Sequence, residues 1–97
     1  MSSYLKKESW VWVFIQNPDK NEEILGQQDE ETGAMFIPVF QAKETAYQCM
    51  NFLAKKQGAK YEPQAIIYED LAHYASENGF SLFVLDGEGK VLEKINP

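Results

Sequence analysis

The chain has 97 residues, and its 15 acidic and 9 basic residues give a net charge of −6. This length predicts one domain over residues 1–97 with a single hydrophobic core. One cysteine excludes an internal disulfide, and the longest apolar run, 10–15, is shorter than a membrane helix of ~18 residues. The short apolar runs lead us to expect no membrane partner. The acidic balance repels phosphate backbones, so we expect no nucleic-acid partner.

The N-terminal residues favour a cytoplasmic protein. Two lysines stand in the first eight residues, but no small-residue cleavage site follows the apolar run, so we expect no signal peptide. We also expect residues 1–7 to form a loosely ordered segment before the first strand.

The first predicted strand, residues 8–15, is apolar on both faces. Its alternation places two sets on opposite sides: Trp10, Trp12 and Phe14 on one, and Val11, Val13 and Ile15 on the other. A strand of this kind is typical of the centre of a sheet.

A predicted hairpin follows the first strand. A weaker strand over 22–28 and a returning strand over 34–40 are joined by a turn at 29–33. Pro38 cannot donate a hydrogen bond to a neighbouring strand, so it belongs at an edge or a bulge.

Helical spacing begins after Gln41 and predicts a helix over 43–57 that ends at Gly58. Its first turn lacks a side-chain cap because Ala42 has no side-chain oxygen. Its apolar stripe consists of Ala42, Ala46, Cys49, Met50 and Leu53.

The remaining chain predicts one more helix among three strands. A linker at 61–63 leads into a strand over 64–67 and a helix over 68–78, which ends at Gly79. Strands over 80–85 and 90–95 follow, joined by a turn at 86–89.

Together the elements predict a single α+β domain with a mixed, mostly antiparallel sheet of five or six strands and two helices. We expect both hairpins to be antiparallel and both strand–helix–strand crossovers to be parallel. Two helices are too few to cover both faces of such a sheet, whether they lie on one face or one on each.

The residues that could carry catalysis do not form a recognisable set. Cys49 lies on the apolar stripe of its helix, and His73, the sole histidine, lies on the polar side of the second helix. We therefore expect a buried, inert thiol and no enzyme activity. One cysteine and one histidine cannot make a zinc site, and the turn at 86–89 lacks a calcium loop's ligands, so we expect no metal or cofactor.

The run 36–46 resembles the motif (I/L)-P-(V/L)-F-T-S-x-E-x-A of SseB N-terminal-like domains, which occur in small bacterial proteins. Pro38, Phe40, Glu44 and Ala46 match it, whereas Gln41 and Ala42 replace its Thr-Ser. The resemblance implies an α+β fold and names no catalytic residues. Some members of that family are associated with type III secretion.

The sequence thus favours a non-catalytic protein-interaction or accessory domain. Its predicted contact surface is the set Trp10, Trp12 and Phe14, and burial of such a surface predicts a homodimer or another protein partner. The alternative is a small-ligand-binding domain whose groove would be lined by Tyr47, Tyr61, Tyr68 and Tyr74.

Overall fold

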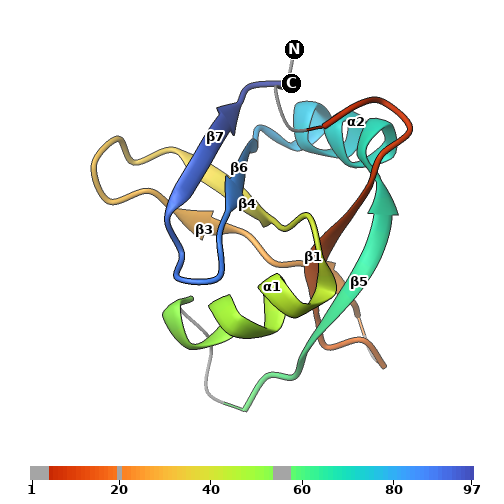
Figure 1. Cartoon of the computed structure of the whole chain (residues 1–97), viewed down its shortest axis with the longest axis vertical. Helices are drawn as coiled ribbons and strands as arrows, with labels where there is room; N and C mark the ends of the chain where they lie inside the picture. Colours follow the sequence, from red (N-terminus) through yellow and green to blue (C-terminus); the bar gives the residue numbers. More distant parts are fainter. Residues whose placement is uncertain (1–4, 20, 54–57) are drawn as a thin grey trace.

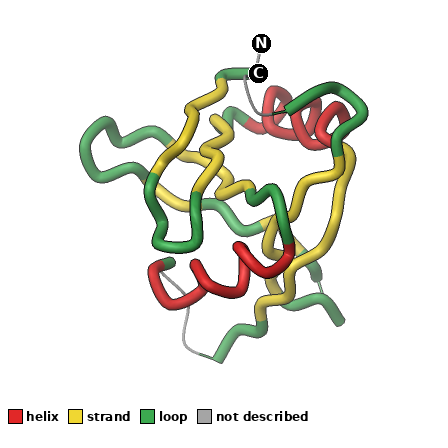
Figure 2. Tube along the Cα trace, viewed as in Figure 1, coloured by secondary structure: helices red, strands yellow, loops and turns green. Residues whose placement is uncertain are grey.

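Seven strands and two α-helices make up the described part of the chain, residues 5–19, 21–53 and 58–97 of a computed structural model (Figures 1 and 2). The elements in chain order are β1 Trp10–Gln16, β2 Glu23–Ile24, β3 Gln27–Gln28, β4 Met35–Val39, α1 Lys43–Cys49, a 3₁₀ turn Met50–Phe52, β5 Tyr61–Ile67, α2 Tyr68–Asn78, β6 Ser81–Leu85 and β7 Val91–Ile95.

The strands form two sheets, of order β2-β1-β5 and β3-β4-β6-β7. All neighbours are antiparallel except β4 and β6, which pair in parallel. The α+β class and the mostly antiparallel pairing are therefore confirmed, but the single sheet of five or six strands is not what forms. β1 does lie at the centre of its sheet, as its two apolar faces predict.

The predicted strand over 22–28 divides into β2 and β3, which belong to different sheets. Leu25 and Gly26 separate the two strands, and a Cβ at Gly26 would lie 2.7 Å from the Phe80 ring. Because this residue has no side chain, the Phe80 ring can pack directly on the backbone where the chain passes from one sheet to the other.

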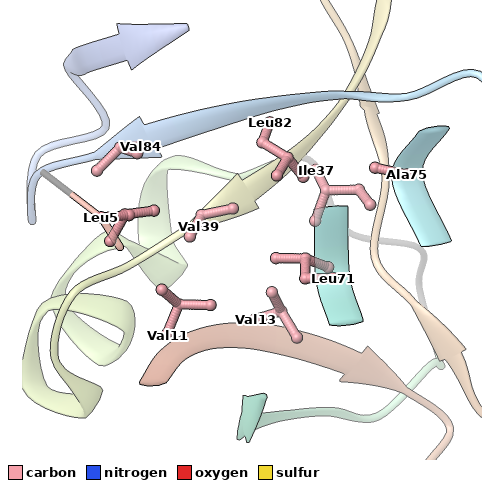
Figure 3. Close-up of a cluster of buried hydrophobic side chains, with 9 residues drawn as sticks. All are labelled: Leu5, Val11, Val13, Ile37, Val39, Leu71, Ala75, Leu82 and Val84. Carbon is pink, nitrogen blue, oxygen red and sulfur yellow. The ribbon is translucent and has the colours of Figure 1, made fainter. Parts of the chain in front are cut away.

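The two helices lie on opposite sides of the strands (Figure 1). On the α2 side, Leu71 and Ala75 pack with alternate residues of β1, β4 and β6; Figure 3 shows this cluster, which comprises Leu5, Val11, Val13, Ile37, Val39, Leu71, Ala75, Leu82 and Val84. The α1 side has a second cluster: Phe14, Leu25, Phe40, Ala46, Cys49, Phe83 and Leu85. β1 and β6 contribute buried side chains to both clusters because their sequences alternate two apolar sets.

The predicted crossovers are not parallel. The chain leaves β4 through α1 and enters β5, which pairs antiparallel with β1 in the other sheet. The parallel neighbour of β4 is β6, reached only after α2. Both predicted hairpins are antiparallel, as β3–β4 and β6–β7.

The first helix is shorter than the predicted 43–57. It starts at Lys43 without a side-chain cap, as expected, but ends at Cys49, and Leu53 has an extended backbone. The four residues after Leu53 have no large apolar side chain, so a longer helix would bury little more there; residues 54–57 themselves lie outside the described part.

Residues 5–9 contact the core and α2, and the loosely ordered segment expected over 1–7 stays a prediction. Leu5 is buried in the cluster beside α2. The first two N–H groups of α2 donate to the carbonyls of Ser9 (2.8 Å) and Lys7 (3.1 Å). Backbone carbonyls thus cap a helix that has no side-chain cap. Residues 1–4 lie outside the described part.

Two prolines lie within strands. Pro63, in the predicted linker, belongs to β5, an edge strand where its missing N–H can be tolerated. Pro38 is in β4, but the neighbouring β3 pairs only with Met35 and Phe36 and has ended before Pro38 is reached. Its predicted edge-like position is therefore confirmed.

Candidate functional site

The three residues of the predicted contact surface have very different environments. Trp10 is 62% exposed, Trp12 is half-buried, and Phe14 is 2% exposed within the cluster beside α1. Phe14 packs edge-to-face on Phe40, with ring centroids 5.6 Å apart. On this face of β1, the side chains of Trp10 and Trp12 are therefore accessible, whereas that of Phe14 is not.

Side chains from β5 extend this surface. The register places Trp10 opposite Ile67 and Trp12 opposite Ala65, and such partners project from the same face. Ile67 is half-buried and Ala65 is exposed. The sheet thus presents a run of apolar side chains beyond the part that α1 covers.

The first turn of α1 forms the border of this run. The Lys43 ammonium lies 5.6 Å from the Trp12 ring centroid and 6.0 Å from that of Tyr47, a cation–π arrangement with both rings. Tyr47 is 51% exposed. We call the set Trp10, Trp12, Tyr47, Ala65 and Ile67 the tryptophan patch.

Sequence reasoning found the two tryptophans of this patch but missed Tyr47, Ala65 and Ile67. The alternation in β1 gives the face on which its own side chains lie. The partners of β1 depend on which strand pairs with it and in which register, and the predicted layout left strand order open. The sequence instead predicts Tyr47 in a ligand groove.

The four tyrosines of the predicted groove are not brought together. Tyr61 and Tyr74 line one open groove of about 620 Å³, together with Phe80 and polar side chains that include Gln16 and Gln27. The Tyr74 and Phe80 rings stack with centroids 6.4 Å apart.

The other two tyrosines lie elsewhere. Tyr68 packs against the cluster beside α2, and burial, followed by the charge of Glu93, raises the pKa of its hydroxyl. Tyr47 belongs to the tryptophan patch.

Cys49 and His73 are on opposite sides of the strands. Cys49 lies in α1 and is fully buried; burial, followed by the charge of Asp86, raises the pKa of its thiol. His73 is exposed on α2, where its Nε2 lies 2.7 Å from Oε1 of Glu77. The two side chains therefore cannot form a nucleophile–base pair in this fold.

The turn at 86–89 is held by its own aspartate. Oδ1 of Asp86 accepts the backbone N–H of Glu88 and of Lys90, each at 2.9 Å. Within the described residues, no three His, Cys, Asp or Glu side chains gather closely enough to hold a metal ion.

In the described part of the chain, no helix is both long and apolar enough to cross a membrane. The fold and the patch define a small α+β domain with an exposed aromatic face. Searches of protein-family models, curated proteins and solved structures find no match for the chain.

Proposed function

We propose that the protein is a cytoplasmic, non-catalytic protein-interaction or accessory domain that binds its partner through the tryptophan patch. The observation that carries this proposal is the 62% exposure of Trp10 on a central strand, beside Ile67 and half-buried Trp12. Tryptophan is usually highly buried in folded proteins, and Trp and Tyr are the residues most enriched at the energetic centres of interfaces.

The form of the patch supports a protein partner. Trp10 and Trp12 do not line the open groove described above, and their neighbours on β5 are aliphatic. A surface of aromatic and aliphatic side chains, with the Lys43 ammonium at its border, suits another protein surface better than a small molecule. A second copy of this chain is the first partner to examine, because a two-fold dimer would bury the patch against itself.

A small-ligand-binding domain is the second candidate. The groove of about 620 Å³ lined by Tyr61, Tyr74 and Phe80 supports it, since its lining combines these aromatic side chains with the amides of three glutamines. Membership of the SseB N-terminal-like family, which the motif at 36–46 suggests, is compatible with either candidate.

The protein-interaction proposal is tested with Trp10→Ala and a matched control, Leu92→Ser. Leu92 is also exposed, at 40%, but lies on β7 in the other sheet. Sedimentation velocity at micromolar concentration is expected to show a dimer for the unchanged chain and for Leu92→Ser, and a monomer for Trp10→Ala.

If the unchanged chain is monomeric, the same pair of variants is compared for retention of partners from the native host. Loss with Trp10→Ala alone supports the proposal. Equal behaviour of the two variants in both measurements contradicts it.

A further inference from the structure

A second surface lies on the sheet β3-β4-β6-β7. It is on the same face as α1 but beyond the part that α1 covers. The rings of Phe36 and Phe83 stack there with centroids 4.1 Å apart and planes at 10°. They form part of a groove of about 490 Å³ whose apolar lining is Phe36, Phe52, Leu53, Phe83, Leu85 and Val91. Phe52 and Val91 are 62% and 44% exposed, so apolar surface is open to a partner.

The groove has an acidic rim. Two loops contribute to it, with Asp29, Glu30 and Glu31 from the β3–β4 turn and Glu88 from the β6–β7 turn. Glu30, Glu31 and Glu88 are exposed, and none of them forms an ion pair with another described residue. The rim therefore carries negative charge that a cationic partner could neutralise.

Lys94 of the same chain shows how a basic side chain fits this surface. Its ammonium lies 5.0 Å from the Phe83 ring centroid and 3.8 Å from Oδ2 of Asp29. The Asp29 carboxylate is held in place by hydrogen bonds from the Thr32 hydroxyl (2.9 Å) and the Glu31 N–H (3.2 Å). A cation on an apolar stem is thus accommodated between an aromatic face and a fixed carboxylate.

We propose that this groove binds a basic segment of a partner protein in which Lys or Arg residues alternate with apolar residues. The apolar side chains would contact the Phe36–Phe83 pair and Phe52, and the cations would meet the glutamates of the rim. The groove shares no residue with the tryptophan patch, so this second contact stands independently of the proposed function.

The test uses a fluorescent synthetic peptide of alternating Leu and Lys, and a second peptide with Glu in place of Lys. Fluorescence anisotropy is expected to show binding of the basic peptide alone, weakening as salt is raised because the contacts are exposed ion pairs. Replacing Glu30, Glu31 and Glu88 together by Gln is expected to weaken binding about tenfold.

A control of equal net charge separates the groove from general attraction to an acidic protein. Glu22, Glu62 and Glu69 are exposed and lie outside the groove lining, so replacing all three by Gln should leave the affinity within about twofold. Circular dichroism of both triple variants checks that they are folded. Equal weakening by the two sets would overturn the proposal.

Two further measurements test the apolar contacts of the peptide and the place where it binds. Phe52→Ala is expected to weaken peptide binding, whereas Leu92→Ser, which lies outside the groove lining, should leave it unchanged. Amide shifts on peptide addition should concentrate at Gln28, Glu31 and Gly89. Amide shifts confined to the tryptophan patch, or no binding of the basic peptide, would contradict the assignment. If the peptide does not bind and the Glu30, Glu31 and Glu88 triple variant loses self-association, the occupant of the groove is a second copy of this chain, which also contradicts it.

Discussion

Trp12 and Phe40 donate their backbone N–H groups to each other's carbonyl oxygens, at 2.8 and 2.9 Å. This pair of hydrogen bonds connects β1 to Phe40, the residue that follows β4, and so links the two sheets. The Phe40 side chain is fully buried beside Phe14. The strand that carries Trp10 and Trp12 is therefore hydrogen-bonded to the second sheet as well as to its own neighbours.

The first prediction concerns the stability of the Trp12–Phe40 hydrogen-bond pair. The amide protons of Trp12 and Phe40 are expected to exchange with solvent only on global unfolding, because both sheets must separate before either bond opens. The amide of exposed Glu30, in the β3–β4 turn, serves as the comparison and should exchange much faster. Hydrogen exchange followed by NMR measures all three, and fast exchange at Trp12 and Phe40 would show that the sheets separate independently.

The second prediction ranks three truncations by burial. Leu71 is fully buried against both sheets, so Leu71→Ala should lower the free energy of unfolding by ~2–5 kcal/mol. Leu53 is half-buried, and Leu53→Ala should cost about 1–2 kcal/mol, less than its place on the predicted stripe suggests. Exposed Glu31→Ala should stay within ~0.5 kcal/mol. Urea denaturation gives the order, and a larger loss for Leu53 than for Leu71 would contradict the assignment of the core.

Local pattern predicted the helices better than the sheets. The bounds of α2 are those expected, and Gly79 has the left-handed φ of 76° that ends it. The start of α1 was also correct. The division into two sheets was missed because it depends on the break at Leu25–Gly26 and on the Trp12–Phe40 pair, whose residues are far apart in the sequence.

The candidate site was also predicted only as far as local pattern allows. Alternation along β1 correctly placed Trp10, Trp12 and Phe14 on one face, but it does not say what lies over that face. α1 contributes Ala46 and Cys49 to the cluster around Phe14 and leaves Trp10 open. One helix lies on each side of the strands (Figure 1). Trp10 and Tyr47 in the tryptophan patch, and Phe52 and Val91 in the groove, remain exposed.

The third prediction concerns the reactivity of Cys49. Its side chain is fully buried, and burial, followed by the charge of Asp86, raises the pKa of the thiol above its ordinary value of 9.0. Alkylation by iodoacetamide, followed by mass spectrometry, is expected to be very slow in the native protein and rapid in denaturant. Rapid alkylation of the folded chain would show that the thiol is an accessible nucleophile after all.

The fourth prediction concerns acid pH. Hydrogen bonds from the N–H groups of Lys90 and Glu88 lower the pKa of the Asp86 carboxyl below its ordinary value of 3.8. A group with a lowered folded pKa contributes stability that is present above 3.8 and is lost as the pH falls through the folded value. Between about pH 5 and about pH 2, the unchanged chain should therefore lose more stability than Asp86→Asn. Equal losses in urea titrations at the two pH values would show that the turn does not depend on this charge.

The interaction surface itself is tested most directly by photocrosslinking from single positions. A photoreactive amino acid is placed at position 10, in the tryptophan patch, or at position 92, on β7, and both proteins are irradiated in the native host. We predict a discrete crosslinked species, either a dimer of this chain or a complex with one other protein, from position 10 and not from position 92. Absence of any product from position 10, or the same product from both positions, would contradict a role of the tryptophan patch in partner binding.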